Sequence, residues 1–343
     1  MTSLPMPRAR PTGGASLADT FGRVARDLRV SVTDRCNLRC TYCMPAEGLP
    51  WMPRAEMLTD EELLRVIRVF VRLGVRQVRL TGGEPLLRRS LVDVVAGIAA
   101  LEPRPSIAMT TNGVGLERVA GRLADAGLDR VNISLDTIDS ETFSRLTRRD
   151  RLNDVEKGLA AAAEAGLTPV KVNAVAMRGI NDESVADVLA WCLDRGYELR
   201  FIEQMPLDAQ HAWNRDVMVG AEEVRRRLSE RFTLTPLPAA DRGSAPAERF
   251  LVDGGPATVG IIASVSEPFC GTCDRARLTA DGQVRNCLFS EQETDLRGPL
   301  RDGASDSELA GLINGEMWRK ARGHGIGNPD FHQPTRPMSS IGG

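Results

Sequence analysis

Six short β-rich segments alternate with six helical segments, and this alternation restricts the folds open to the chain more than any other feature of its sequence. The predicted strands span residues 28–33, 75–81, 106–112, 129–136, 169–175 and 199–205. The predicted helices span residues 59–72, 88–101, 116–126, 139–147, 152–165 and 182–195. Repeated strand–helix units favour parallel strands joined by right-handed crossovers. The pattern therefore predicts an α/β fold, either an open, partial barrel or a doubly wound sheet.

Local signals mark where several of these helices begin and end. Thr59 and Glu62 have the spacing of a capping box at the start of the first helix. Helices are expected to end at the glycines of the segments RLGV, DAGL, EAGL and DRGY, because glycine readily takes the left-handed conformation that terminates a helix.

The alternation ends after about residue 232. A Pro/Ala-rich loop follows, then two apolar β-like runs and a hairpin predicted to turn at Asp281 and Gly282. The first residues carry prolines at positions 5, 7 and 11 and lack the apolar segment of a secretory signal. We therefore predict a disordered tail over residues 1–20, a barrel over 21–232 and a C-terminal α+β region over 233–343.

Charge and hydropathy exclude two broad classes of protein. The net charge is −2, from 44 basic and 46 acidic residues, which argues against a nucleic-acid-binding protein. No uninterrupted apolar run approaches the roughly 18 residues of a membrane span. We expect a cytoplasmic protein that binds neither nucleic acid nor membrane.

Three cysteines, Cys36, Cys40 and Cys43, lie in the tight segment CNLRCTYC that follows the first predicted strand. A structural zinc site needs four ligands, and the three histidines of the chain, at 211, 324 and 332, are all distant in sequence. Three thiolates can instead hold three irons of a cubane cluster and leave the fourth iron open. The spacing favours the cluster, with zinc as the alternative.

The ends of the other five predicted strands also carry polar or reactive residues. They are the segment TGGEP (81–85), the segment TTNG (110–113), Ser134 with Asp136, Lys171 with Asn173, and Glu203 with Met205. Each of these residues taken alone fits a purely structural role, such as a turn, a solvated charge or a core side chain. Functional sites in parallel βα folds form at the carboxyl ends of the strands. Because all of these residues lie at such ends, they predict a functional site along that edge of the sheet.

The segment CNLRCTYC followed by TGGEP resembles the radical S-adenosylmethionine superfamily. The resemblance implies a partial (β/α)6 TIM-like barrel and a 4Fe–4S cluster on the three cysteines, whose open iron binds S-adenosylmethionine. It also implies a 5′-deoxyadenosyl radical that abstracts a hydrogen atom from the substrate. The residues that would hold S-adenosylmethionine are Tyr42, Gly83, Ser134 and Met205.

A second triad, Cys270, Cys273 and Cys287, again offers three thiols. The segment CGTCDRARLTADGQVRNCL and the final Gly-Gly resemble the GTP 3′,8-cyclases of molybdenum cofactor biosynthesis. The resemblance runs from about Leu28 to Gly343 and implies a second 4Fe–4S cluster on this triad, facing the guanine of GTP. The residues that would hold GTP are Arg29, Arg79, Thr110, Lys171, Arg275 and Arg277. Arg285, across the hairpin, is a weaker candidate.

The same resemblance implies the reaction and the partners. GTP would be cyclised to 3′,8-cyclo-7,8-dihydro-GTP, with no catalytic side chain beyond the clusters and with Gly342 and Gly343 assisting from the tail. Electrons would come from a reductant protein, and the product would pass to a cyclic pyranopterin monophosphate synthase. The sequence leaves the oligomeric state open and is compatible with a homodimer.

Two other functions remain open at this point. One is a radical enzyme that carries an auxiliary cluster and modifies a peptide, which the first triad alone does not reject. The other is a zinc-binding interaction module without catalysis. Binding of GTP would separate the first from a cyclase, and iron and sulfide content would separate the second.

Overall fold

A single sheet runs through the molecule in the computed structural model, which describes residues 16–342. Within that range twelve strands pair in the order β12-β11-β10-β1-β2-β3-β4-β5-β6-β9-β8-β7. The strands are β1 (Asp27–Ser31), β2 (Gln77–Thr81), β3 (Ser106–Thr111), β4 (Arg130–Ser134), β5 (Lys171–Val175), β6 (Glu198–Ile202), β7 (Leu234–Pro236), β8 (Glu248–Val252), β9 (Thr258–Ile262), β10 (Arg275–Leu278), β11 (Gln283–Arg285) and β12 (Thr294–Asp295).

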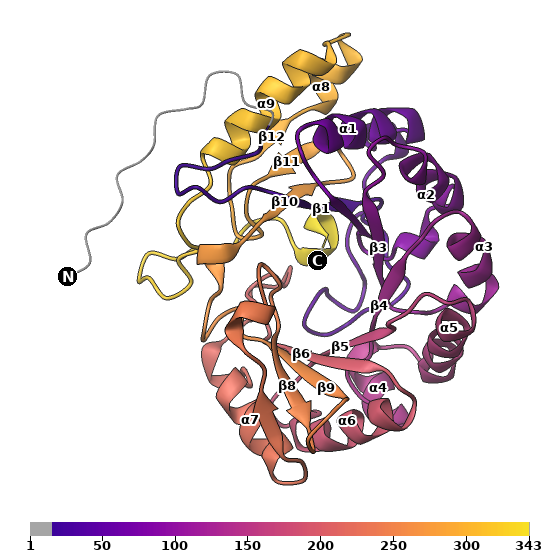
Figure 1. The fold of residues 1–343 in the computed structure, drawn as a ribbon, viewed down its shortest axis with the longest axis vertical. Coiled ribbons are helices and arrows are strands. Elements are labelled where there is room, and N and C mark those ends of the chain that lie inside the picture. Colours follow the sequence, from indigo (N-terminus) through magenta and orange to yellow (C-terminus); the bar gives the residue numbers. More distant parts are fainter. Residues whose placement is uncertain (1–15, 343) are drawn as a thin grey trace.

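Most α-helices of the described chain cover the outside of this sheet (Figure 1). The α-helices are α1 (Asp60–Arg72), α2 (Leu91–Ala99), α3 (Ala120–Asp125), α4 (Ser140–Thr147), α5 (Leu152–Glu164), α6 (Val185–Asp194), α7 (Ala221–Ser229), α8 (Arg297–Arg301), α9 (Asp306–Trp318) and α10 (Met338–Ile341). Figure 1 shows the sheet curling into an open ring, with α1 to α7 outside and the C-terminal end of the described chain inside. Strands β1 to β6 are parallel and pair in sequence order. The prediction of a partial (β/α)6 barrel is confirmed.

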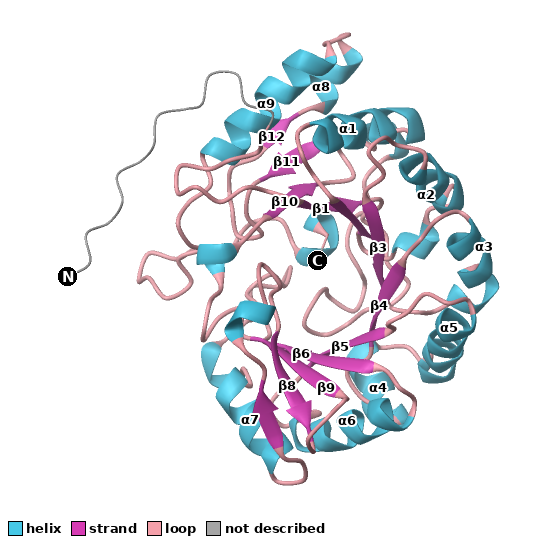
Figure 2. Cartoon of the chain, viewed as in Figure 1, coloured by secondary structure: helices cyan, strands magenta, loops and turns pink. Residues whose placement is uncertain are grey.

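The sheet continues beyond the point where the sequence alternation stops. On one side β9 pairs parallel with β6, and on the other side β10 pairs parallel with β1. Strands from the region after residue 232 therefore flank both edges of the six-stranded barrel (Figure 2). The predicted hairpin is present as β10 and β11, and Gly282 at its turn has φ +81°.

Each barrel strand has an apolar face and a polar face. In β1, Leu28 and Val30 are fully buried in the core between sheet and helices. The intervening Asp27 and Arg29 line a cavity inside the barrel, as Arg79 does from β2. Because side chains alternate along a strand, this pattern directs charged groups into the barrel and apolar groups outward.

The predicted helix signals agree with the structure. Thr59 and Glu62 form a capping box at the start of α1, with the Thr59 side chain accepting from the Glu62 amide. The glycines of the four segments expected to end helices all have positive φ, namely Gly74, Gly127, Gly166 and Gly196.

The predicted disordered tail is wrong for its last five residues, while residues 1–15 lie outside the described part. Leu17 is fully buried, and Ala18 forms an antiparallel bridge with Val24. Asp19 accepts hydrogen bonds from the amides of Phe21 and Arg23. Local turn bonds and one buried leucine therefore order residues 16–20. Among the described residues, the structure contains no helix long and apolar enough to cross a membrane.

Close packing of α5 on the end of β3 gives a test of the fold. A Cβ atom on Gly158 would lie 2.3 Å from the carbonyl oxygen of Gly113, whereas one on Gly311, within α9, would meet nothing within 4 Å. Glycine in a helix costs about 1 kcal/mol relative to alanine, and overpacking costs about 1–3 kcal/mol.

We therefore expect Gly158→Ala to lower the free energy of unfolding by up to about 2 kcal/mol, measured by urea denaturation. The matched control Gly311→Ala should raise it by up to about 1 kcal/mol. Equal effects of the two substitutions would contradict the packing of α5 on the turn after β3.

Candidate active site

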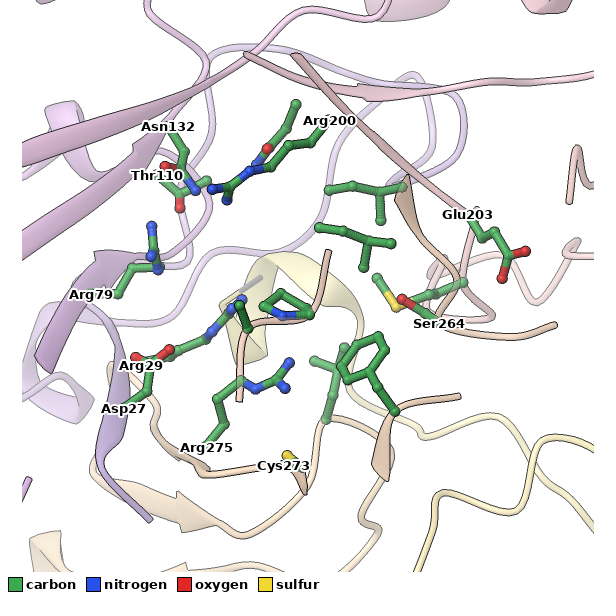
Figure 3. Close-up of a pocket in the computed structure, with 18 of the residues that line it drawn as sticks. Asp27, Arg29, Arg79, Thr110, Asn132, Arg200, Glu203, Ser264, Cys273 and Arg275 are labelled. Carbon is green, nitrogen blue, oxygen red and sulfur yellow. The ribbon is translucent and has the colours of Figure 1, made fainter. Parts of the chain in front are cut away.

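A cavity of about 970 Å³ occupies the interior of the barrel. Figure 3 shows the side chains of Arg29, Arg79 and Arg275 directed into the same space as those of Thr110 and Asn132. All six residues predicted to hold GTP line this cavity, namely Arg29, Arg79, Thr110, Lys171, Arg275 and Arg277. Of the four predicted to hold S-adenosylmethionine, Tyr42, Ser134 and Met205 line it as well.

The first cysteine triad lies on the loop that follows β1, at the carboxyl end of the barrel strands. Cys43 and Met44 both donate from their amides to the Cys40 carbonyl, at 3.0 and 3.1 Å, which forms a tight turn. Arg39 holds the start of the loop by donating to the carbonyls of Cys36 and Leu38 at 2.8 and 2.9 Å. All three thiols are free and partly exposed.

Burial raises the pKa of Cys36 to about 11 and that of Cys43 to about 12. Without a bound cation these thiols keep their protons. Iron would have to displace those protons on binding.

Gly83 lies in the turn after β2, packs against the start of the cysteine loop and does not line the cavity. Its amide donates to the Thr33 carbonyl at 2.8 Å, and a Cβ atom there would lie 2.3 Å from the Arg35 carbonyl oxygen. Only a residue without a side chain allows the loop this close to the turn after β2.

Glu84, which sequence reasoning passed over, joins that turn to the end of β3. Its carboxylate accepts from the Thr111 hydroxyl and the Asn112 amide, both at 2.7 Å. Asn112 in turn donates to Asn37 at 2.7 Å and lies 3.9 Å from the Cys36 sulfur. Burial raises the pKa of Glu84 to about 7. Its place in TGGEP was the only signal in the sequence.

Tyr42 and Asp136 form a buried pair beside the first triad. The Tyr42 hydroxyl donates to Asp136 Oδ2 at 2.7 Å, and Asp136 Oδ1 accepts from the Val175 amide at 2.9 Å. Burial raises the pKa of Asp136 to about 6. Asp136 was noted at the end of its strand but was not predicted as a site residue.

Three arginines stand side by side across neighbouring strands of the barrel. Arg29 of β1 is in register with Arg277 of β10 on one side and with Arg79 of β2 on the other. Burial and the charge of Arg29 lower the pKa of both Arg79 and Arg277 to about 9. Like charges in this register repel one another, so the row is unfavourable unless an anion binds to it.

Several nitrogen atoms of these arginines are also unpaired. Within residues 16–342, Arg29 Nε, Arg79 Nε and Nη1, Arg275 Nη2 and Arg277 Nε are buried without a hydrogen-bond partner. A buried donor without a partner costs about 1–3 kcal/mol. The arrangement is therefore suited to an anion with several oxygens, such as a phosphate chain.

Other residues of the cavity complete this polar surface. Lys171 lies 3.0 Å from Glu198, which balances part of its charge. Arg130 and Arg200 also line the cavity and were missed, because an arginine in a strand gives no sign of facing inward. Among the described residues, Asn132 Oδ1 and Asn173 Oδ1 are buried acceptors without a donor.

The second cysteine triad lies at the opposite end of the cavity. Cys270 and Cys273 precede β10, which runs parallel to β1, so they lie at the amino end of the barrel strands. Cys287 follows β11, which is antiparallel to β10, and therefore returns to the same end. All three line the cavity, as Cys43 does from the first triad.

Within the second triad, the surroundings of Cys273 favour a thiolate, whereas burial raises the pKa of Cys270. Burial raises the pKa of the Cys273 thiol, but the charges of Arg275 and Lys320 outweigh it and lower that pKa to about 7. The Arg275 guanidinium also packs on the Phe269 ring, at 4.9 Å from its centre.

Both triads offer a donor set that fits an iron–sulfur cluster. No three His, Cys, Asp or Glu side chains in the described part of the chain converge as they would on one metal ion. The thiolates of a cubane bind separate irons and need no such convergence.

The C-terminal segment enters the barrel from the side of the first triad. Arg336 anchors it through two bonds to the Asp281 carboxylate, at 2.7 and 3.1 Å. Gly342 has φ +84°, and a Cβ atom there would lie 2.3 Å from Thr81 Oγ1 and 3.1 Å from the Ser31 Cβ. The tail thus reaches the carboxyl ends of β1 and β2, while Gly343 lies outside the described residues.

Two known families match successive parts of the sequence. Residues 30–192 match the Radical SAM superfamily, and residues 197–326 match the family called Molybdenum Cofactor Synthesis C. The first match implies S-adenosylmethionine and a 4Fe–4S cluster. Among solved structures, Streptococcus suis SuiB bound to S-adenosylmethionine has a TM-score of 0.61 at 14% identity, covering 92% of this chain and 77% of that chain. At that identity the likeness concerns the fold alone.

The relatives in sequence are much closer. The GTP 3′,8-cyclase of Streptomyces coelicolor is 61% identical over 332 residues, which cover 96% of this chain and 97% of that protein. The GTP 3′,8-cyclase 2 of Mycobacterium tuberculosis strain H37Rv is 60% identical, covering 98% of this chain and 94% of that protein. With relatives this similar over nearly its whole length, the chain belongs to the GTP 3′,8-cyclase family.

Proposed function

We propose that this protein cyclises GTP to 3′,8-cyclo-7,8-dihydro-GTP, the first step of molybdenum cofactor biosynthesis. The observation that carries the proposal is the row of arginines with buried, unpaired nitrogens in a cavity with a cysteine triad at each end. A triphosphate carries nearly four negative charges, and guanidinium groups bind phosphate oxygens in pairs. The family membership of the chain supports the same substrate.

GTP would lie between the two triads. Arg29, Arg79 and Arg277 would bind its phosphates, with Arg275 at the edge of the second triad and Lys171 and Thr110 opposite. Cys270, Cys273 and Cys287 would hold a second 4Fe–4S cluster that faces the guanine. We add Arg130 and Arg200 to the residues that would contact the nucleotide, because both line the same cavity.

S-adenosylmethionine would lie at the other end, beside a cluster on Cys36, Cys40 and Cys43. When bound, this pair supplies the radical that removes a hydrogen atom from the ribose of GTP. Tyr42, Ser134 and Met205 would contact S-adenosylmethionine, and the bond from Tyr42 to Asp136 fixes the tyrosine ring. Gly83 would act indirectly, by letting the cysteine loop close over the turn after β2.

The tail would shield the reacting groups from water. Gly342 already lies against Thr81 and Ser31 at the carboxyl end of the barrel, and we propose that Gly342 and Gly343 assist the reaction there. A reductant protein would supply electrons, and a cyclic pyranopterin monophosphate synthase would take the product. A homodimer is compatible with this scheme.

Iron content tests the two cluster sites. Two cubanes require roughly eight irons per chain after anaerobic reconstitution. Replacing Cys36, Cys40 and Cys43 together by Ala should leave about four irons and abolish formation of 5′-deoxyadenosine. A triple variant that still cleaves S-adenosylmethionine would refute the assignment of the first site.

Replacement of one arginine of the row tests the phosphate site. Arg277→Met should weaken GTP binding about ten- to a hundredfold, measured by titration calorimetry, because a charge-assisted bond is worth about 1.5–3 kcal/mol. The same change should leave the free energy of unfolding unchanged or raise it, because it removes a like charge from beside Arg29.

The control is Arg231→Met, at an exposed pair with Asp187, which should leave GTP affinity unaltered. If Arg277→Met binds GTP as tightly as the wild type, the phosphates lie elsewhere.

A further inference from the structure

A buried lysine makes three contacts at the second triad. Lys320 is only 4% exposed. Its ammonium donates to the Cys273 carbonyl at 3.2 Å, to the Cys273 sulfur at 3.3 Å and to the Arg275 carbonyl at 2.8 Å. All three hydrogens of the ammonium group are thereby used on one cysteine and the residue two places after it.

The choice of lysine at this position is unusual for the chain. The 44 basic residues include lysines only at 157, 171 and 320, so the remaining 41 are arginines. An ammonium group is compact and directs three donors around a point, whereas the guanidinium fork is flat and extended. The three acceptors of Lys320 surround one point, which a lysine can satisfy and an arginine cannot.

The segment that carries Lys320 also braces the other two cysteines. Glu316, at the end of α9, accepts from the Asn286 side chain through its carbonyl and its carboxylate, at 3.0 and 2.7 Å, and Asn286 precedes Cys287. Arg23 donates to the Cys270 carbonyl at 2.8 Å and to the Arg322 carbonyl at 3.0 Å. Residues 316–322 therefore connect to all three parts of the chain that bear the triad.

We infer that Lys320 is a positioning residue for the second cluster, which it serves in two ways. It holds the Cys273 loop against the start of β10, and it donates an N–H bond to the sulfur that binds iron. Hydrogen bonds and positive charge at a ligand sulfur stabilise the reduced cluster and raise its reduction potential. The inference rests on the proposed function, because it requires a cluster at Cys270, Cys273 and Cys287.

The experiment uses the Cys36/Cys40/Cys43→Ala protein as parent, so that only the second cluster is present. Lys320→Met removes the charge and the donors, Lys320→Gln keeps a donor without the charge, and Lys157→Met is an exposed control. Iron and sulfide are measured after reconstitution. The midpoint potential is then measured by reductive titration with dithionite, followed by electron paramagnetic resonance.

We expect Lys320→Met to keep about four irons and to show a lower potential. At a fixed applied potential the ratio of reduced to oxidised cluster should fall at least tenfold, equal to about 59 mV for a one-electron couple. The midpoint potential of Lys320→Gln should lie between those of Lys320→Met and the parent, and the potential of Lys157→Met should equal that of the parent.

Four other results would each decide the question. Loss of the cluster from Lys320→Met with its recovery in Lys320→Gln would support the positioning role directly. If Lys320→Met misfolds, a lowered potential in Lys320→Gln supports the inference. An assembled cluster with the parent's potential in the variants that fold overturns it. A parent that binds no iron would instead refute the second cluster, and with it the proposed function.

Discussion

Mutual repulsion among buried arginines is the constraint on which the rest of the site depends. Arg29, Arg79 and Arg277 lie in register on three neighbouring strands, and each has at least one buried nitrogen without a hydrogen-bond partner. Such a row lowers the stability of the empty protein, because buried charge without a partner is costly. The helices and the apolar faces of the strands must therefore supply stability from outside the ring, while the inside is arranged for a bound anion.

The direction of the strands places the two cysteine triads at opposite ends of the cavity. Because β10 runs parallel to β1, residues before β10 and residues after β1 lie at opposite ends of the cavity. One triad therefore faces the amino ends and the other the carboxyl ends, with the arginine row between them. A nucleotide held on that row would lie within reach of both, and the tail at Gly342 lies against Thr81 and Ser31 at one end.

Local sequence patterns predicted the barrel well, because periodicity and caps act over a few residues. The six parallel strands, the capping box at Thr59 and the turn at Gly282 are all present. The pairing of β9 and β10 with the two edges of the barrel was not predicted, because it joins residues far apart in sequence. Leu17 was missed for a similar reason, since one buried side chain outweighs a proline-rich context.

The candidate site shows the same difference between local patterns, which the sequence reveals, and contacts between distant residues, which it does not. Cysteine spacing, strand-end residues and the family resemblance pointed to part of the cavity lining, but Glu84, Asp136 and Lys320 gain their roles from burial and from partners in other elements. Spacing could not distinguish Arg200, which faces the cavity, from an arginine on the surface. Gly83 shows the opposite difference. Its motif pointed to a residue that holds S-adenosylmethionine, but Gly83 packs against the cysteine loop and does not line the cavity.

The most direct measurement of the central claim compares the affinities of GTP and guanosine for the reconstituted protein by titration calorimetry. If the arginine row exists to bind phosphates, GTP should bind at least about a hundredfold more tightly than guanosine. That advantage should shrink as salt is added, because screening weakens charge pairs. Equal affinities for GTP and guanosine would contradict the account, because they would leave the buried arginines without a ligand.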